Sequence, residues 1–458
     1  MNYLDDTIAA ISTPIGQGGI GIVRISGPGA LRIADTLFQH KKKGPPSHMD
    51  SNLLQCGYLI DPAGNQVVDE VLLSVMRSPH SYTRENVVEI NCHGGMIAVK
   101  KVLELVLSQG ARLAEPGEFT KRAFLNGRIS LTQAEAVLDL ITAKTEESMR
   151  IAAEQLEGGL AKRLDTIRND LLELCSQVEA HIDFPEDEIE TIPYEKLMTQ
   201  TNRIKDTIDT LSRTFQDARF FREGLKVVIA GRPNVGKSSL LNALLKKDRA
   251  IVTEIPGTTR DEIEEYISIR GLPIRITDTA GIRQSDETVE KEGIRRSLRA
   301  LERADFIIAL IDGSEPLTSE DRDMLSKVSE KHAVIAINKA DLRTVVEPMQ
   351  ATAKPYLRIS ALTGEGIEEL KTVLFNENLK DWEEERTGVV VTNIRHKHAL
   401  DQASAHMEQA NTCITDNQPM EILAIELRDA LDAIGEISGM VTSADILNKI
   451  FNAFCIGK

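Results

Sequence analysis

Residues 225–239 read LKVVIAGRPNVGKSS, and this stretch determines the fold class of the central part of the chain. Its first six residues are apolar except for Lys226, which is typical of a strand buried on both faces of a parallel sheet. The next residues match the pattern GxxxxGKS, whose glycines let backbone N–H groups wrap around phosphates at the start of a helix. Strand, loop and helix in this order predict a nucleotide-binding α/β domain.

Further apolar runs at residues 274–276, 306–311 and 333–337 are separated by helix-like stretches. This alternation predicts βαβ units around a parallel sheet. Within the phosphate loop, Lys237 is expected to reach the terminal phosphates and the Ser238 hydroxyl to ligate Mg²⁺.

The loops after these strands complete the predicted nucleotide site. The tetrad Asp278-Thr279-Ala280-Gly281 supplies a carboxylate near the magnesium shell and the Gly281 amide for the γ-phosphate. In the segment Asn338-Lys339-Ala340-Asp341, Asp341 can accept both N–H donors of the guanine edge, which adenine lacks. Ser360-Ala361-Leu362 is expected near the base oxygen. The motifs together predict a domain that binds GTP.

A switch loop is predicted at residues 257–261 (GTTRD), with a threonine that closes on Mg²⁺. Residue 282 is Ile, where Ras-like proteins have the glutamine that positions the attacking water. From the residues alone, Arg260 is either an arginine finger or a solvated switch residue. Asn234 either holds a monovalent cation or stabilises the loop as a turn residue.

The regions on either side of this domain have different patterns. Residues 1–125 carry strand signals together with one helix signal, which predicts a compact α+β domain. The expected elements are strands at 7–12, 21–25, 67–75 and 87–91 and a helix at 96–107.

From Ser130, which forms a capping-box signature with Gln133, long helices are predicted. Apolar stripes at helical spacing predict a helical bundle; their residues are Leu160, Leu164, Ile167, Leu171, Leu174 and Val178, then Leu197, Thr201, Ile204, Ile208, Leu211 and Phe215. Helices return at 394–407, 420–434 and 444–454. The α/β domain is therefore expected to be inserted into one helical domain.

Composition limits the class of protein. A length of 458 residues, with 41% hydrophobic and 27% charged residues, predicts about three globular domains. The net charge of −16 argues against a surface that coats nucleic acid, and Lys41–Lys43 is expected to be a solvated loop. No apolar run approaches a membrane span, and the cysteines form no CxxC pair. The expectation is a reduced, soluble, cytoplasmic protein without a disulfide framework or zinc site.

From end to end the sequence resembles the MnmE (TrmE) family of bacterial and organellar tRNA modification GTPases. The segments that carry the resemblance are residues 18–27 (GGIGIVRISG), 91–95 (NCHGG), 115–127 (EPGEFTKRAFLNG), 257–261 and 455–458 (CIGK). The terminal tetrapeptide and the segment 115–127 are more discriminating than the GTPase motifs.

The resemblance implies an N-terminal α+β tetrahydrofolate-binding and dimerisation domain, a discontinuous all-α helical domain and an inserted Ras-like P-loop α/β G domain. The expected boundaries are residues 1–122, 123–222, 223–378 and 379–458. It implies a homodimer that works with the FAD-containing protein MnmG (GidA) on C5 of the wobble uridine of certain tRNAs. There it adds an aminomethyl or carboxymethylaminomethyl group, with a one-carbon unit from a 5-formyl or 5,10-methylene tetrahydrofolate. The acidic chain is then expected to reach tRNA through a partner or a local basic patch.

The resemblance also assigns site residues. Arg24, Glu85 and Lys458 map onto folate positions, as does Arg128, where the family often has Lys. Mg²⁺ is implied at Ser238 and Thr259. The implied K⁺ ligands are Asn234, Thr253, Ile255 and Thr258. Hydrolysis on dimerisation of G domains is implied to use Lys237, Asn234 with its K⁺, and Glu290 as the group that orients water.

The whole implied set of GTP-binding residues is Asn234, Val235, Gly236, Lys237, Ser238, Ser239, Thr253, Glu254, Ile255, Pro256, Gly257, Thr258, Thr259, Asp278, Thr279, Ala280, Gly281, Asn338, Lys339, Asp341, Ser360 and Ala361.

An alternative function is a ribosome-assembly switch, because the G domain also resembles the Era and EngA types. Neither a KH module nor a second G domain occurs in the sequence, which favours tRNA modification. Cys455 is interpreted as a tail residue near the folate site, and His93 as structural, so neither is a catalytic candidate.

Overall fold

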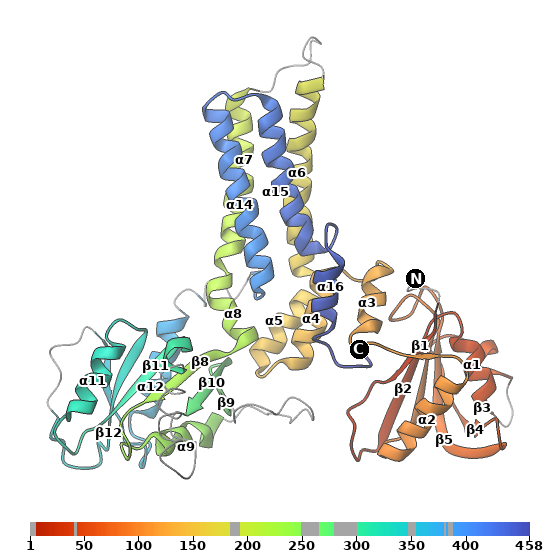
Figure 1. The fold of residues 1–458 in the computed structure, drawn as a ribbon, viewed down its shortest axis with the longest axis horizontal. Helices are drawn as coiled ribbons and strands as arrows, with labels where there is room; N and C mark the ends of the chain where they lie inside the picture. Colours follow the sequence, from red (N-terminus) through yellow and green to blue (C-terminus); the bar gives the residue numbers. More distant parts are fainter. Residues whose placement is uncertain are drawn as a thin grey trace. The chain divides into compact units, whose positions relative to one another are not determined.

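The computed structural model describes residues 6–40, 44–183, 193–248, 265–278, 300–346, 354–379, 382 and 388–458. The chain forms two compact units, Met1–Leu138 with Gly435–Lys458, and Asp139–Ile434 (Figure 1). Each unit has its own sheet and its own core, so the chain is a multidomain protein with mixed α and β structure. The domain boundaries at residues 122, 222 and 378 stay predictions.

The first unit is built on a sheet with the strand order β3-β4-β5-β6-β2-β1-β7. Its strands are β1 (Ile8–Ile11), β2 (Ile20–Ser26), β3 (Phe38–Gln39), β4 (Leu54–Asp61), β5 (Gln66–Met76), β6 (Val87–His93) and β7 (Arg112–Leu113). Neighbours are antiparallel except for β1 and β7. The predicted strands are confirmed as β1, β2, β5 and β6. Strand β4 was not predicted, because Cys56 and Gly57 interrupt its apolar pattern.

Helices α1 (Ala30–Leu37) and α2 (Met96–Ser108) pack on this sheet, and their apolar residues share its core. The predicted helix at 96–107 is confirmed. A Cβ atom at Gly21 would collide with the side chain of Val99 on α2. Glycine at position 21 therefore permits the close approach of strand and helix.

The last residues of the chain lie against the first unit. Helices α3 (Glu118–Leu125), α4 (Leu131–Thr142) and α16 (Ala444–Phe451) surround a small apolar cluster. Beyond α16, Phe119 N donates to Lys458 O at 3.1 Å and Ser12 Oγ donates to Gly457 O at 3.1 Å. The C-terminal tail thus belongs to the same unit as the N-terminal sheet.

The capping box predicted at the start of α4 is confirmed. Ser130 N donates to Gln133 Oε1 at 2.9 Å, and Gln133 N donates to Ser130 Oγ at 3.2 Å.

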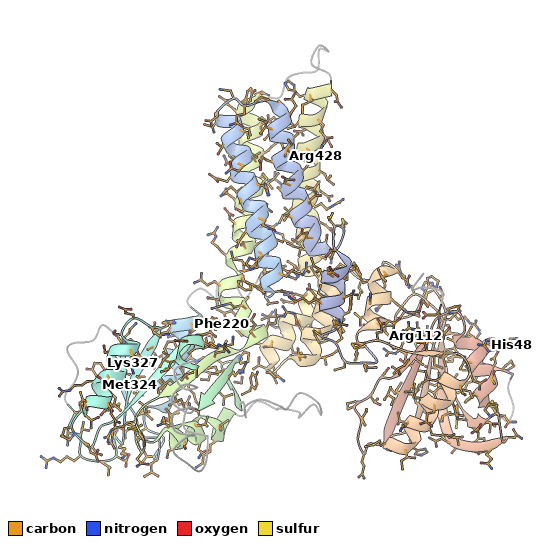
Figure 2. All side chains as sticks on the ribbon, in the orientation of Figure 1. His48, Arg112, Phe220, Met324, Lys327 and Arg428 are labelled. Carbon is orange, nitrogen blue, oxygen red and sulfur yellow. The ribbon has the colours of Figure 1, made fainter. Side chains whose placement is uncertain are left out.

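The second unit contains a bundle of long helices that run side by side (Figure 1). Its helices are α5 (Glu146–Leu156), α6 (Gly159–Asp183), α7 (Tyr194–Arg213), α8 (Phe215–Glu223), α14 (Ile394–Thr415) and most of α15 (Met420–Ser438). Both predicted apolar stripes are buried, one along α6 and one along α7 and into α8. At the surface, Arg428 of α15 pairs with Glu179 of α6 at 2.7 Å (Figure 2).

A second sheet, with the order β13-β12-β11-β8-β10-β9, completes this unit. Its elements are β8 (Leu225–Ala230), α9 (Lys237–Asp248), β9 (Glu265–Ile269), β10 (Leu272–Asp278), β11 (Phe306–Asp312), α11 (Ser319–Val328), β12 (Ala333–Asn338), β13 (Tyr356–Arg358) and α12 (Ile367–Asn378). All neighbours are parallel except β9 and β10, so the predicted βαβ organisation is confirmed.

The segments that precede β8 contact the segment that follows α12 in the chain. Phe221, just before β8, stacks on Trp382 with ring centroids 4.2 Å apart. Gln155 Nε2 of α5 donates to Val390 O at 3.1 Å, and Val391 N donates to Thr214 Oγ1 at 3.0 Å. Segments before and after the sheet therefore meet beside it, and the insertion of this domain into one helical domain stays a prediction. No helix among the described ranges has the length and apolar character that crossing a bilayer requires.

Candidate functional site

The phosphate-binding loop lies at the carboxyl edge of the parallel sheet, between β8 and the first turn of α9. Its backbone takes left-handed conformations at Asn234 (φ 66°) and Gly236 (φ 103°). A Cβ atom at Gly236 would collide with the Asn338 amide, so only glycine fits there. The loop leads directly into the N-terminus of α9, where backbone N–H groups and the helix dipole favour an anion.

Lys237 is held at the mouth of this loop. Its side chain is largely buried, and Nζ donates to Gly231 O at 2.8 Å and to Arg232 O at 2.9 Å. Ser238 and Ser239 follow in the first helical turn and are exposed. Asp278, at the end of β10, is in register with Ile229 of the adjacent β8. The backbone thus brings the predicted phosphate and magnesium positions to one edge of the sheet.

Asn338 joins three parts of the site. Its side chain is buried, and Nδ2 donates to Val235 O of the phosphate loop at 2.7 Å. Its Oδ1 accepts from Ala361 N at 2.9 Å. One amide side chain therefore fixes the phosphate loop and the 360–362 loop relative to the base motif.

The base motif presents Asp341 at the surface, where its Oδ1 accepts from Ser360 Oγ at 2.5 Å. Lys339 has φ 66° and donates from Nζ to Asp312 Oδ2 at 2.5 Å. Burial acts to raise the pKa of Asp312, but hydrogen bonds from Lys339 and Ser314 outweigh it and leave this pKa below its usual range. These residues fit a guanine nucleotide, since Asp341 presents carboxyl oxygens, which can accept hydrogen bonds, at the surface.

Several predicted site residues lie outside the described residues. They are Thr253, Glu254, Ile255, Pro256, Gly257, Thr258, Thr259, Arg260, Thr279, Ala280, Gly281 and Glu290. The Lys41–Lys43 triplet and Ile282 lie outside them as well.

A second cluster of charged and aromatic groups lies in the first unit. The Arg24 guanidinium carbon is 5.4 Å from the centroid of the Tyr82 ring, and that of Arg128 is 4.7 Å from it. Arg24 Nε also pairs with Glu89 at 2.8 Å. Two cations around one aromatic ring fit a planar, anionic ligand. Tyr82 was not predicted, and its place between strands β5 and β6 gave no periodic signal.

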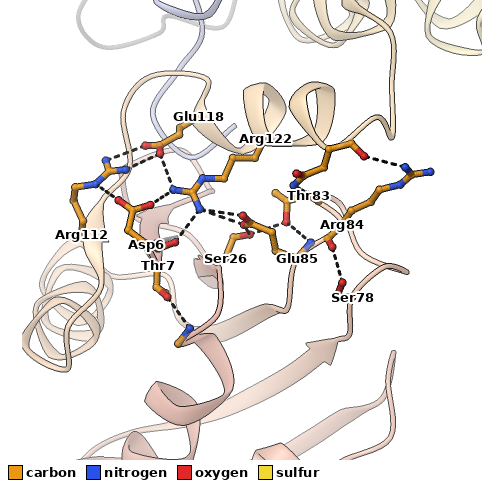
Figure 3. A network of polar contacts seen from close by, with 12 residues as sticks. Asp6, Thr7, Ser26, Ser78, Thr83, Arg84, Glu85, Arg112, Glu118 and Arg122 are labelled. Atoms are coloured by element: carbon orange, nitrogen blue, oxygen red, sulfur yellow. Dashed lines mark hydrogen bonds and ion pairs between the residues drawn. The ribbon is translucent and has the colours of Figure 1, made fainter. Parts of the chain in front are cut away.

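Glu85, another predicted folate position, belongs to a partly buried ion network (Figure 3). Its Oε2 accepts from Ser26 Oγ at 2.6 Å, and Arg122 NH1 donates to its Oε1 at 3.1 Å. Arg122 is almost fully buried and also binds Asp6 at 2.5 Å and Glu118 at 3.0 Å. Glu85 is therefore oriented by a guanidinium from α3.

Sequence reasoning named Glu85 but missed its partners in this network, Asp6, Arg112, Glu118 and Arg122. The only local signal is the spacing of Glu118 and Arg122, which allows an ion pair along a helix. Burial acts to raise the pKa values of Asp6 and Glu118, but hydrogen bonds from Arg112 and Arg122 outweigh it and lower both.

His93 and Cys455 were interpreted as residues without a catalytic role, and this stays a prediction. The His93 side chain is 73% exposed and pairs through Nδ1 with Asp69 Oδ1 at 2.6 Å. Burial raises the pKa of the neighbouring Cys92 thiol to about 11, so it is a poor nucleophile at neutral pH. Cys455 is exposed, and its backbone carbonyl accepts from Gly117 N at 3.4 Å. Lys458 is placed by the backbone contacts of the tail.

Comparisons with known proteins agree with this architecture. A family model described as the MnmE helical domain matches residues 131–455, and one described as the GTP-binding protein TrmE N-terminus matches residues 7–128. The chain belongs to the MnmE family.

Similar relatives carry the name tRNA modification GTPase MnmE. The protein of Geobacter sulfurreducens is 47% identical over 458 residues. Those of Alkaliphilus metalliredigens and Clostridioides difficile are 46% and 45% identical over 460 residues. In all three the match covers 100% of both chains. These relatives show that this MnmE-family chain is a GTPase that acts in tRNA modification, and the described residues of its nucleotide site include a phosphate loop and a base motif.

Proposed function

We propose that this chain hydrolyses GTP in order to drive the modification of C5 of the wobble uridine in certain tRNAs. The observation that carries the proposal is the double role of Asn338, which bonds to Val235 of the phosphate loop and to Ala361 beside the base motif. A nucleotide that joins these parts must carry both phosphates and a guanine-like edge. Family membership supplies the tRNA substrate class.

The roles of the protein groups follow from their positions. Lys237 leaves its carbonyl acceptors and neutralises charge on the terminal phosphates, and Asp341 accepts the N–H donors of guanine. A bound Mg²⁺, which polarises the phosphate oxygens, would be held by Ser238 and Thr259 with Asp278 near its shell. Glu290 is proposed to orient the attacking water in place of the missing glutamine.

We place a K⁺ ion at Asn234, together with Thr253, Ile255 and Thr258. Asn234 is exposed and takes φ 66° in the phosphate loop, and its side chain carries an amide oxygen that can ligate a cation. A monovalent cation there would supply the positive charge that an arginine finger supplies elsewhere.

The cation role is tested with steady-state GTP hydrolysis in KCl and NaCl at equal ionic strength. We expect faster turnover in KCl and the loss of this difference in Asn234→Ala. Asn234→Gly is the matched variant, because glycine removes the amide side chain and still adopts the left-handed backbone without strain. If Asn234→Gly keeps the K⁺ preference, the side chain serves the turn and not the cation.

For the first unit we propose a tetrahydrofolate derivative as the one-carbon donor, in the 5-formyl or 5,10-methylene form. Arg24, Arg128 and Lys458 would attract the folate carboxylates, Tyr82 would offer a stacking face, and Glu85 would accept N–H donors. Calorimetric titration of 5-formyltetrahydrofolate tests this site. Arg24→Ala should weaken binding by about tenfold, and Arg128→Lys should retain most of it because the cation stays. Unchanged binding in Arg24→Ala would remove Arg24 from the site.

The remaining proposals concern the domains and the assembly. The domains are residues 1–122, residues 123–222 together with 379–458, and residues 223–378. The chain forms a homodimer through the N-terminal domain and works with an FAD-containing MnmG partner. Mass spectrometry of wobble uridine in tRNA from a strain that lacks this chain tests the whole function. Loss of the C5 modification, restored by the wild-type gene and not by Asp341→Asn, is the expected result. Unchanged modification in the deletion strain would contradict the proposal.

A further inference from the structure

Arg232 links the phosphate loop to the start of helix α11. It directly follows Gly231, and its NH2 donates to Glu315 Oε2 at 2.6 Å. Its Nε lies 3.4 Å from Asp321 Oδ2. Asp321 is 1% exposed, whereas Glu315 is 57% exposed. The buried contact with Asp321 is therefore the one shielded from solvent and salt.

Asp321 is held independently of Arg232. Its Oδ2 accepts from Thr318 N at 3.0 Å and from Thr318 Oγ1 at 2.9 Å, and Thr318 Oγ1 accepts from Asp321 N, which forms the capping box of α11. The other oxygen, Oδ1, is buried without a hydrogen bond, as is Arg232 Nε. The helix start thus presents a fixed, incompletely satisfied carboxylate to the phosphate loop. A buried charge of this kind strongly favours an adjacent opposite charge.

The backbone of Arg232 contacts the phosphate-binding part of the nucleotide site, and its side chain contacts the segment that supports the base motif. Its backbone carbonyl accepts from Lys237 Nζ at 2.9 Å, on the phosphate side. The segment that leads to Glu315 and α11 also supports the base motif, since Gly313 N donates to Asn338 O at 2.8 Å and Asp312 pairs with Lys339. Arg232 therefore connects the phosphate loop to the same segment that holds Asn338 and Lys339.

We infer that Arg232 is a positioning residue for the nucleotide, which acts through Asp321 to hold the phosphate loop at a fixed place relative to the base motif. The inference rests on the GTP site of the proposed function. Arg232 needs no contact with the nucleotide for this role. Because the phosphate loop surrounds the phosphates shared by GDP and GTP, both ligands should be affected alike.

The test uses the full-length chain, with calorimetric titration of GDP and steady-state GTP hydrolysis. Arg232→Ala should raise the Kd for GDP and the KM for GTP by about tenfold each, with kcat within about twofold of wild type. Arg232→Lys, which keeps a cation within reach of Asp321, should recover most of this loss. Glu315→Gln should stay within about twofold of wild type, because the Glu315 side chain is exposed.

Asp321→Asn provides the second line of the test, since asparagine retains the helix cap and removes the charge. It should weaken GDP binding, and the double variant with Arg232→Ala should bind no more weakly than Arg232→Ala alone. The matched control is Arg219→Ala, which removes an arginine paired with Asp305 at 3.6 Å at the opposite end of β8 and should leave GDP binding unchanged.

Two results would overturn the inference: GDP binding by Arg232→Ala within about twofold of wild type, or losses in Arg232→Ala and Asp321→Asn that simply multiply in the double variant. Wild-type chain that binds no GDP would instead overturn the proposed nucleotide site itself.

Discussion

The nucleotide site of the second unit and the charged cluster of the first unit are built in opposite ways. At the nucleotide site, each motif is a contiguous stretch placed at the end of a strand, and the parallel sheet gathers these ends at one edge. In the first unit, Arg24, Glu85, Arg128 and Lys458 come from distant parts of the chain. Tertiary packing alone brings such residues into one unit.

The charges also differ in what satisfies them. Lys237 is satisfied by two neutral carbonyl oxygens, which a phosphate can replace. Arg122 is satisfied by the carboxylates of Asp6, Glu85 and Glu118. The carbonyl contacts of Lys237 can be exchanged for phosphate oxygens, whereas the charge of Arg122 is neutralised by carboxylates within the protein. Substitutions in the two regions should therefore fail in different ways, one in binding and the other in stability.

The largest effect is expected at the base-reading end of the nucleotide site. Asp341→Asn replaces one of the two carboxylate acceptors by an N–H donor, so it should disfavour guanine and favour xanthine, whose base has an acceptor at that position. The ratio of kcat/KM for GTP to that for xanthosine triphosphate should fall on the order of 10³-fold. Because Asp341 is exposed, thermal unfolding should change little. Retained GTP preference would contradict the base-reading role of Asp341. It would also weaken the distinction between a nucleotide site that binds a ligand and an ion network that stabilises the first unit.

In the first unit the corresponding test is Arg122→Met. Methionine keeps much of the volume, removes the arginine that Glu85 pairs with, and leaves Asp6 and Glu118 with Arg112 as their remaining arginine partner. Removing one partner of a buried ion pair should destabilise this unit by about 3–5 kcal/mol. Hydrogen exchange followed by mass spectrometry localises the loss, which should be confined to peptides of β1, β2 and α3.

Arg112→Met is the matched control for this substitution. Arg112 binds Asp6 and Glu118 of the same network, but its side chain is 39% exposed. Its removal should cost about 1 kcal/mol or less. Equal losses for both variants would show that burial is not what distinguishes the two arginines. Nucleotide binding should be unchanged in either variant.

The same contrast explains how far the sequence could be interpreted. Residues 225–239 combine an apolar run with a contiguous motif, and α6 has an apolar stripe at helical spacing, so strand β8, the phosphate loop and the bundle helices were predictable. The pairing of Arg122 with Asp6 joins residues far apart in sequence, and no local pattern reports it. Tyr82 was missed for the same reason, because it becomes a candidate site residue only through its contacts with Arg24 and Arg128 from other segments.

A smaller effect is expected on the stability of the first unit when the pH is lowered. The pKa values of Asp6 and Glu118 are lowered in the folded state, since the arginine hydrogen bonds exceed the effect of burial. A carboxyl group of this kind stabilises the folded state fully at a pH above its pKa in the unfolded state. This contribution is lost as the pH falls through its pKa in the folded state. The first unit should therefore lose stability as the pH drops below about 4.5, the ordinary value for Glu118.

Glu118→Gln should flatten this part of the pH dependence, because the amide has no proton to gain. Hydrogen exchange of β1 and α3 peptides, corrected for the intrinsic effect of pH on exchange, measures it. A wild-type first unit whose stability is flat between pH 6 and about pH 3 would contradict the assignment.

The smallest effect is expected at Cys455. Its thiol is exposed, and the tail is held by backbone contacts, among them the bridge between Pro116 and Ile456 and the bond from Phe119 N to Lys458 O. Cys455→Ser should change the free energy of unfolding by less than about 0.5 kcal/mol. Gly457→Ala is the informative neighbour, because Gly457 has φ 98° and a Cβ atom would collide with Ile11 O.

These two variants distinguish an effect of the position of the C-terminal tail from a chemical role of the Cys455 thiol. Gly457→Ala should release the tail, seen as faster exchange in the peptide that contains Phe119, and should reduce wobble uridine modification as Lys458 loses its position. Cys455→Ser should leave both exchange and modification unchanged. If Cys455→Ser abolished modification while exchange stayed unchanged, the thiol would take part in the chemistry, and the tail would be a reactive segment as well as a packed one.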